Sequence, residues 1–303
     1  MKLKISLLIL GLLTPLYSFS NSIQVTHWLG EVTLASEPKR VVVIGLGALD
    51  ALDAFGIEPV AVTKSIHLPD YLKKYQAKKY ASSGSLFEPD FESIYSQKPD
   101  VIIIGPRASG NYDELSKIAP TIVFANGENV DYWKATQQQW RNLGKIFNMK
   151  EKVENKIEAI NRDFQLIQQY TKKHGDDALT VMTSGSNVTT FGKESRFSAI
   201  YQNFGFKQAA TSIKSSRHGD LISYEFISKA NPSILFVIDR DKLLNKEKVT
   251  NLASFSNDLV KTTKAYQQGR IVFLDLNAWY LSMAGVTATE QMVDDIKKLI
   301  PLD

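Results

Sequence analysis

The chain has 303 residues, of which 44% are hydrophobic and 22% charged, and its net charge is +4 at pH 7. This composition is typical of a globular protein long enough for two domains, and the chain holds no basic run of the kind that binds nucleic acid. Cysteine is absent, which excludes disulfides, thiolate metal sites and a lipid-modified cysteine anchor.

The beginning of the chain has the three-part layout of a secretory signal peptide. Lys2 and Lys4 precede an apolar run at residues 5–13, and the small-residue pattern of residues 18–20 follows. The run is too short to span a bilayer. We expect residues 1–20 to be the signal peptide. Loss of its two lysines lowers the net charge from +4 to +2 and leaves a periplasmic protein without a membrane anchor.

The first half of the mature chain reads as alternating strands and helices. Residues 23–34 alternate apolar with polar side chains and predict an edge hairpin. The apolar run at 40–44 suits a strand buried on both faces of a parallel sheet. A helix at 48–55 ends at Gly56, a residue type that favours a C-cap. The other elements expected here are strands at 60–62, 101–104 and 121–124, helices at 91–97 and 111–118, and a loop at 67–84.

This alternation predicts an α/β fold with mainly parallel strands. Ligands of such sheets bind beyond the carboxyl ends of the strands, where Gly45, Arg107 and Ala125 lie. Gly45 and Gly47 alone are a weak dinucleotide motif, because Asp50 stands where a third glycine belongs.

The middle of the chain predicts one long amphipathic helix at residues 150–170. At about 1.5 Å per residue it would span about 30 Å, enough to cross from one lobe to another. We therefore expect an N-terminal lobe at 21–130, a linking helical segment at 131–174 and a C-terminal lobe at 175–303. The C-terminal lobe is expected to resume the alternation at 179–182, 196–204, 223–238 and 270–274, with a last helix at 287–300.

Part of the chain occurs twice at an offset of 133 residues. Residues 91–107 and 224–240 align so that Glu92 matches Glu225 and Arg107 matches Arg240. This repeat predicts two copies of one helix, turn and strand unit. The glutamates stand near helix starts, where a carboxylate offsets the helix dipole, and a matched pair could also dock onto a two-fold partner.

Several residues are candidates for binding a ligand. Arg107, Arg196 and Arg240 come from strand ends or loops, and together they would suit a flat anionic ligand, since guanidinium donates in a planar fork and stacks on rings. His218 lies in a loop and Tyr280 follows the last strand. The chain has no HExxH or GxSxG motif, so no catalytic constellation is predicted.

Short motifs along the mature chain resemble those of the periplasmic substrate-binding proteins of iron siderophore ABC importers, in the branch that binds ferric catecholates. They include PKRVVVI at 38–44, GALDALDAFG at 47–56, GKESRF at 192–197, His218-Gly219 and WYL at 279–281. The resemblance implies a class III fold, in which two three-layer α/β lobes are joined by one long helix and hold the ligand between them.

The resemblance also implies roles for the candidates. Arg107, Arg196 and Arg240 would hold the anionic catecholates, and Phe87 and Trp279 would line the cleft. A tris-catecholate fills the six positions of iron(III), whereas a tetradentate bis-catecholate leaves two for the imidazole of His218 and the phenolate of Tyr280. The residues expected to dock onto the inner-membrane ABC permease dimer are Glu92 and Glu225.

The resulting prediction is a monomeric, non-catalytic carrier whose ligand is the Fe(III)-catecholate siderophore, with no intrinsic cofactor. One alternative is haem or cobalamin binding on the same fold, since His218 or Tyr280 could serve as an axial ligand of haem. The second alternative is an exported α/β hydrolase or oxidoreductase, against which the missing catalytic motifs count. The sequence leaves open which siderophore is natural and whether it is tetradentate or hexadentate.

Overall fold

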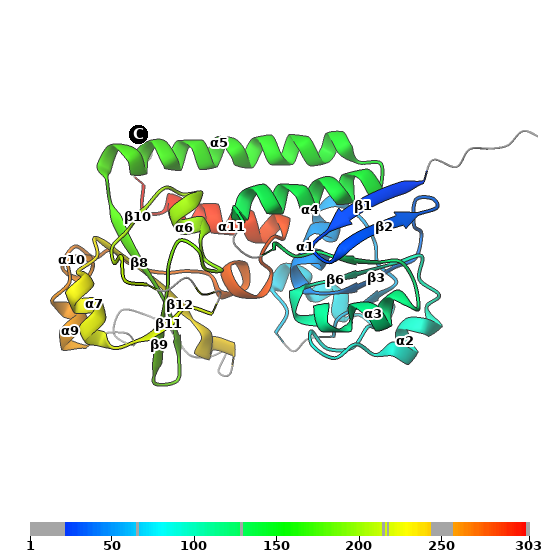
Figure 1. The fold of residues 1–303 in the computed structure, drawn as a ribbon, viewed down its shortest axis with the longest axis horizontal. Coiled ribbons are helices and arrows are strands. Elements are labelled where there is room, and N and C mark those ends of the chain that lie inside the picture. The colour runs from blue at the N-terminus through cyan, green and yellow to red at the C-terminus, as the bar shows by residue number, and fades with distance from the viewer. Residues whose placement is uncertain are drawn as a thin grey trace, which may run out of the picture.

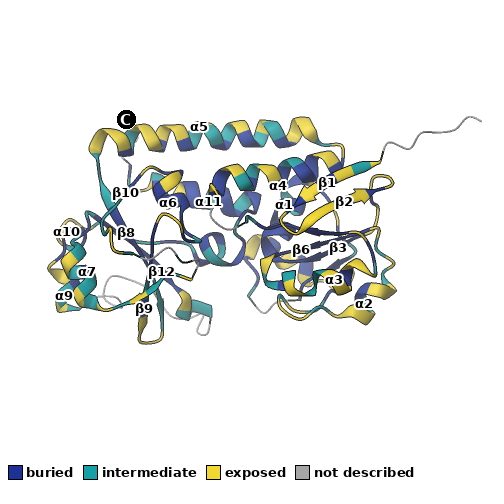
Figure 2. Cartoon of the chain, in the orientation of Figure 1, coloured by how far each residue is buried: buried dark blue, intermediate teal, exposed yellow. Residues whose placement is uncertain are grey.

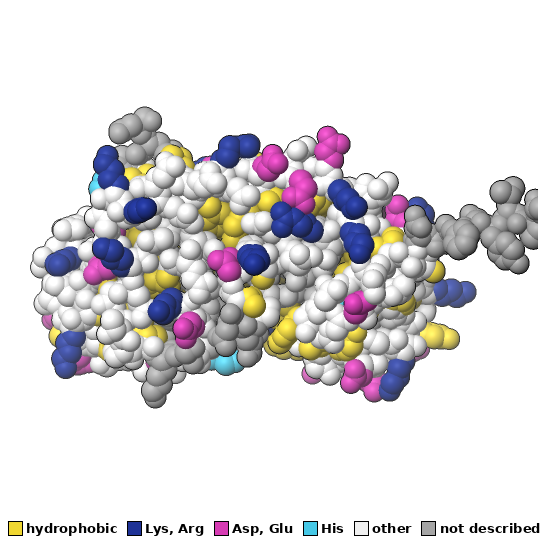
Figure 3. Space-filling view, turned by 45° about the horizontal axis from the view of Figure 1, so that its top comes forward, with side chains coloured by type: hydrophobic (Ala, Val, Ile, Leu, Met, Phe, Trp, Pro, Cys, Tyr) yellow, Lys and Arg dark blue, Asp and Glu magenta, His cyan; other side chains and the backbone are white. Residues whose placement is uncertain are grey.

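The computed structural model describes residues 22–64, 67–127, 130–213, 216, 218–243 and 257–300, so the predicted signal peptide lies outside the described residues. Two β-sheets occupy the two ends of the molecule, and the long helix α5 (Lys150–His174) runs along one side of both (Figure 1). Acidic and basic side chains are interspersed on the face shown in Figure 3. This distribution agrees with the lack of a basic run in the sequence.

The sheet of the N-terminal half has five parallel strands in the order β5-β4-β3-β6-β7. All residues of its central strands β3 and β6 are buried, as expected for apolar runs covered on both faces. The strands are β3 (Val41–Ile44), β4 (Ala61–Val62), β5 (Ala81–Ser82), β6 (Val101–Ile104) and β7 (Thr121–Val123).

The predicted hairpin and the helix that ends at Gly56 are confirmed. Gly56 has φ 81° and closes α1 as a left-handed C-cap. The remaining elements of this half are β1 (Ile23–His27), β2 (Gly30–Leu34), α1 (Leu46–Phe55), α2 (Phe91–Ser96), the 3-10 helices η1 (Asp70–Gln76) and η2 (Pro106–Asn111), and α3 (Tyr112–Ser116).

Two predictions for this half were wrong. Residues 67–84 are more than a loop, because they contain η1 and the edge strand β5, which is too short to show a periodic pattern. The helix expected at 111–118 is shorter, because the preceding turn from Pro106 is a separate 3-10 helix and α3 ends at Ser116.

The linking segment folds as α4 (Tyr132–Ile146) followed by α5. The predicted apolar stripe of α5 is buried, and the helix continues past residue 170 to Gly175, a left-handed C-cap with φ 69°. The buried positions of the stripe are Val153, Ile157, Ile160, Phe164 and Ile167.

The sheet of the C-terminal half is mixed. Its main path is β11-β9-β8-β12-β13, with β10 paired to β8. The pairs β10–β8, β8–β12 and β12–β13 are parallel. The pairs β8–β9 and β9–β11 are antiparallel. The strands are β8 (Asp177–Ser184), β9 (Asn187–Phe191), β10 (Lys207–Gln208), β11 (Asp220–Ile222), β12 (Ile234–Asp239) and β13 (Ile271–Phe273).

Both copies of the repeat fold as a helix followed by an inner strand, namely α2 with β6 and α7 with β12. This confirms the predicted unit. The helices of this half are α6 (Ala199–Gln202), α7 (Tyr224–Ala230), the 3-10 helix η3 (Arg240–Leu243), α9 (Asp258–Lys261), α10 (Lys264–Gln267), the π-helix η4 (Asn277–Leu281) and α11 (Val286–Lys297).

The C-terminal helix α11 returns along the connection between the two halves. It packs against α1 of the first half and against α5. The largest buried apolar cluster runs from Val25 to Ile300 and so includes residues of both halves (Figure 2). The halves therefore share a core made by α4, α5 and α11, while the lobe boundaries given above stay a prediction.

Candidate ligand-binding cleft

A cavity of about 240 Å³ lies at the carboxyl ends of the parallel strands of the first sheet. Gly45, Arg107 and Ala125 follow β3, β6 and β7 and all three line it, where the sequence placed a ligand. Its opposite wall comes from the C-terminal half, through the loop that carries Arg196 and the π-helix that carries Tyr280.

Gly45 belongs at this wall because the backbones of two strand ends meet there. Its φ is 151°, and a Cβ would lie 2.9 Å from the Cα of Gly105. Only glycine fits such an approach without a shift of the neighbouring chain. Both glycines line the cavity.

Three guanidinium groups surround the ring of Tyr280. The Cζ atoms of Arg196, Arg107 and Arg240 lie 4.4, 5.3 and 5.8 Å from the ring centroid. Nη2 of Arg107 and Nη2 of Arg196 also donate hydrogen bonds of 3.2 and 3.4 Å to the carbonyl oxygen of Tyr280. The structure thus brings together three arginines and a tyrosine that are far apart in sequence.

Each arginine comes from a different element. Arg107 lies in η2, directly after β6, and Arg240 begins η3, directly after β12. Their equivalent places in the repeat therefore put them on the two halves. Arg196 lies in the loop after β9, where the buried Ser195 hydroxyl donates to the carbonyl of Gly192 over 2.6 Å.

The π-helix sends Tyr280 and Trp279 in opposite directions. Trp279 is 0% exposed, and its Nε1 donates a 3.0 Å hydrogen bond to Asp295 of α11. The expectation that Trp279 lines the cleft is therefore not met, because its indole is used inside the core. Phe87, the other aromatic residue expected at the cleft, is 63% exposed, and its ring centroid lies 6.0 Å from Cζ of the cavity residue Arg107.

His218 lies in an exposed turn beside the cavity rather than in its wall. Its backbone N–H donates a 3.2 Å hydrogen bond to the hydroxyl of Ser216, which does line the cavity. Gly219 fixes the turn, since its φ is 74° and a Cβ would lie 2.4 Å from the carbonyl of Thr190. Among the described residues, no group of three or more histidines or carboxylates could hold a metal ion.

The cavity also contains residues that the sequence did not single out. Asn126 follows β7 and donates to the carbonyl of Tyr132 over 3.1 Å and to the hydroxyl of Thr136 over 3.0 Å. Glu194, an exposed residue two positions before Arg196 in the sequence, also lines the cavity. The position of Asn126 after a parallel strand is the one signal that could have found it.

Glu92 and Glu225 lie in the first turns of α2 and α7 and are exposed. A hydrogen bond from the Ser223 side chain lowers the pKa of Glu225, so this carboxylate is ionised at neutral pH. Figure 1 shows α2 and α7 in different halves, both on the side of the molecule away from α5. The structure thus keeps the two glutamates apart from each other and outside the cavity wall.

Comparison with known proteins agrees with this architecture. Residues 41–278 match the family described as periplasmic binding protein. The chain belongs to this family. Its members are substrate-binding transport proteins and not enzymes, and their class III fold is the one that the sequence predicted. In the part of the chain that the structure describes, we find no helix long and apolar enough to cross a membrane.

Periplasmic binding proteins of known structure are closely similar to this chain. The crystal structure of the catecholate-siderophore binding protein VctP from Vibrio cholerae has 58% sequence identity and a TM-score of 0.88, and the match covers 91% of this chain and 99% of that chain. The structure of BauB, solved with two molecules of acinetobactin and ferric iron, has 33% identity and a TM-score of 0.85 over 91% of this chain and 98% of that chain.

Two relatives found by sequence comparison are siderophore-binding proteins as well. The petrobactin-binding protein YclQ from Bacillus subtilis is 37% identical over 262 residues, which are 86% of this chain and 82% of the relative. The ferric-anguibactin-binding protein FatB from Vibrio anguillarum is 34% identical over 283 residues, or 91% of this chain and 87% of the relative.

Proposed function

We propose that this periplasmic binding protein captures a ferric catecholate siderophore in the cleft and delivers it to an inner-membrane ABC permease. The observation that carries the proposal is the set of three arginines around Tyr280. A site with this much positive charge suits an anionic ligand, and several binding proteins similar to this chain are named for siderophores.

The geometry of the arginines fits catecholates in particular. Catecholate oxygens on iron(III) carry negative charge and lie in the plane of a flat ring. A guanidinium group can donate to such oxygens and also stack on the ring. Arg107 of the N-terminal half and Arg196 of the C-terminal half both line the cavity. Arg240 approaches Tyr280 from the C-terminal half as well, so a ligand in the cleft would be held from both sides.

For a tetradentate bis-catecholate, the phenolate of Tyr280 and the imidazole of His218 supply the two remaining iron ligands. Tyr280 already lines the cavity. His218 is exposed and two residues away from Ser216 of the wall, so its side chain can turn towards the ligand without unpacking a core. The iron here is cargo, bound through the siderophore, and the protein completes its coordination.

Delivery requires a partner, and the exposed pair of Glu92 and Glu225 suits basic side chains on the two subunits of a permease dimer. The two glutamates have equivalent places in the repeat, as docking onto a two-fold partner requires. With the signal peptide predicted at residues 1–20, the mature protein works outside the cytoplasm as a monomeric carrier.

Tryptophan fluorescence tests the ligand class. The mature protein is titrated with a ferric bis-catecholate, a ferric tris-catecholate, haem and cobalamin. We expect quenching at nanomolar concentrations by a ferric catecholate and none at these concentrations by haem or cobalamin. Tight quenching by haem alone would refute the siderophore proposal and support the alternative.

A further inference from the structure

The turn that carries Tyr280 into the cleft is seated on the first half of the molecule. A Cβ on Gly47 of α1 would lie 2.2 Å from the carbonyl oxygen of Met283, so the two backbones are in contact. From α4, Trp140 Nε1 donates a 2.7 Å hydrogen bond to the carbonyl of Ala284, and the hydroxyl of Tyr132 accepts one of 2.9 Å from its N–H. The segment after Tyr280 is thus held by two helices.

Asp50 of α1 fixes the end of this segment. Its carboxylate is 0% exposed and accepts hydrogen bonds from the N–H groups of Thr287 and Ala288, at 2.9 and 2.8 Å. These groups belong to the first turn of α11, whose N-cap residue is Gly285 and has no side chain to offer. A Cβ on Gly285 would lie 2.2 Å from Oδ2 of Asp50. The carboxylate of Asp50, which lies in α1, therefore acts as the N-cap of α11.

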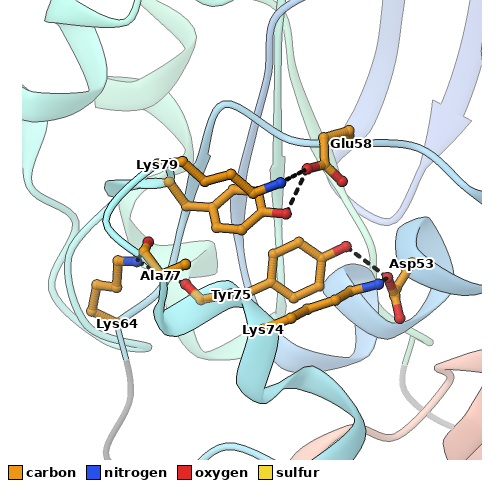
Figure 4. Close-up of polar contacts among 8 residues, drawn as sticks. Asp53, Glu58, Lys64, Lys74, Tyr75, Ala77 and Lys79 are labelled. Carbon is orange, nitrogen blue, oxygen red and sulfur yellow. Dashed lines mark hydrogen bonds and ion pairs between the residues drawn. The ribbon is translucent and has the colours of Figure 1, made fainter.

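A third hydrogen bond reaches Asp50 from η1. The hydroxyl of Tyr71 donates to Oδ2 over 3.1 Å. One turn further along both helices, the hydroxyl of Tyr75 donates to Asp53 over 2.8 Å, and Lys74 pairs with the same carboxylate (Figure 4). The second contact holds η1 against α1 and so keeps Tyr71 in reach of Asp50.

Other contacts in Figure 4 fasten the far end of η1. Nζ of Lys64 donates a 2.7 Å hydrogen bond to the carbonyl of Tyr75, and Lys79 pairs with Glu58 at 2.8 Å. These contacts hold η1, which carries Tyr71, in place against α1.

We propose that Asp50 is the positioning residue of the cleft: by capping α11 from the first half, it holds the turn of Tyr280 in register with Arg107. This inference rests on the function proposed above, since it names what places the ligand-contacting tyrosine. Asp50 itself touches neither the cavity nor Tyr280. Its role is to tie a segment of the C-terminal half to the wall made by the N-terminal half.

We call the contact between the Asp50 carboxylate and the first turn of α11 the anchor, and we expect its stability to depend on pH. Burial raises the pKa of Asp50 to about 6, against the hydrogen bonds from Ala288, Thr287 and Tyr71, which lower it. The groups that face Asp50 are Tyr71 of η1 and the N terminus of α11. The charge of Asp50 also helps to raise the pKa of Tyr132 of α4. Asp275 acts in turn on Tyr71.

The sign follows from proton linkage. The closed anchor, with the raised pKa, binds a proton more tightly than the opened anchor, in which the carboxylate is in water. The stabilisation by that proton is present below the ordinary carboxyl pKa and is lost as pH rises through about 6. Opening of the anchor should therefore increase roughly 20-fold between about pH 4.5 and about pH 7.5.

Hydrogen exchange of the ligand-free protein tests the anchor without any siderophore. After correction for the intrinsic rate, the amides of Thr287 and Ala288 should be less protected at pH 7.5 than at pH 4.5. Asp50→Asn should abolish this difference. Tyr71→Phe keeps the carboxylate but removes a bond that favours its ionised form, so it should move the midpoint to higher pH. Protection of these two amides in a folded Asp50→Ala variant as strong as in the wild type would overturn the inference, because their acceptor would then not be Asp50.

Binding of a ferric bis-catecholate tests the positioning role. Asp50→Ala should weaken binding at least tenfold and alter the visible charge-transfer band that a Tyr280 phenolate bound to iron would give. Asp50→Asn keeps a hydrogen-bond acceptor, so its affinity and its band should be closer to those of the wild type. The matched control is Asp163→Ala, which removes the carboxylate paired with Lys297 at the other end of α11 and should leave the band unchanged. An unchanged band in a folded Asp50→Ala variant would contradict the role. If the wild type bound no catecholate, the proposed function would fail while the exchange result still decided the anchor.

Discussion

The guanidinium carbon of Arg196 lies 4.4 Å from the centre of the Tyr280 ring, and its Nη2 also reaches the carbonyl of Tyr280 at 3.4 Å. The two residues are 84 positions apart in the chain. Their contact joins the loop after β9 to the π-helix, so the cationic group and the phenol enter the cleft as one unit.

Arg196→Ala should weaken binding of a ferric catecholate by about 10- to 100-fold, because hydrogen bonds to charged groups contribute about 1.5–3 kcal/mol. Arg196→Lys should recover part of the affinity, since lysine keeps the charge but loses the planar fork. Isothermal titration calorimetry gives both values. Arg141→Ala is the matched control, because Arg141 pairs with Glu154 outside the cleft. Equal affinity in all four proteins would show that Arg196 does not contact the ligand.

Replacing His218 and Tyr280 together, by Ala and Phe, should affect one class of ligand more than the other. A bis-catecholate complex needs two further iron ligands, whereas a tris-catecholate complex is already saturated. We expect a large loss of affinity and an altered visible charge-transfer band for the bis-catecholate, and little change for the tris-catecholate. Spectrophotometric titration measures both. A band that survives the double substitution would refute direct coordination.

Glu92→Arg combined with Glu225→Arg should abolish uptake of the ferric siderophore by cells and leave the affinity of the purified protein intact. Both side chains are exposed and lie outside the cavity wall, so charge reversal acts on the partner alone. Glu114→Arg in α3, another exposed glutamate, serves as the control and should transport normally. Loss of affinity in the double variant would mean that the glutamates belong to the ligand site.

The pair of Asp176 and Arg270 predicts a pH dependence of stability. Two hydrogen bonds of 3.0 and 2.6 Å join them, and the guanidinium lowers the pKa of Asp176. A lowered folded pKa gives stability that is present above the ordinary carboxyl pKa and lost as pH falls through the folded value.

Asp176→Asn should therefore lower the free energy of unfolding by about 1–3 kcal/mol at neutral pH. Chemical denaturation across a pH series measures the difference from the wild type, which should shrink as the solution is acidified below the ordinary carboxyl pKa. A difference that stays constant down to the acid limit would assign the loss to packing instead.

The elements that could be predicted from sequence are those whose signal is local. The apolar run of β3 and the apolar stripe of α5 are enough to predict that these residues are buried, and Gly56 marks a helix end that is left-handed in the structure. The repeat likewise placed Arg107 and Arg240 on the two halves, because equivalent positions in equivalent units follow equivalent strands.

The features that the sequence missed depend on distant partners. The antiparallel strand β9 pairs with the long β8, and its threonine-rich sequence gives no clear pattern. Trp279 points into the core because it lies in a π-helix and its Nε1 donates a hydrogen bond to Asp295 of α11. Asp50 caps a helix from a distance in sequence, since its hydrogen-bond partner Thr287 lies 237 positions later. In each case the residue type allows several roles, and only the tertiary fold selects one.

The most direct test of the account is a crystal structure of the mature protein with a ferric bis-catecholate. The account predicts the complex at the carboxyl ends of β3, β6 and β7, with catecholate oxygens hydrogen-bonded to Arg107, Arg196 and Arg240 and with iron bonded to the phenolate oxygen of Tyr280. A complex bound elsewhere, or bound in the cleft without contact to these arginines, would contradict it.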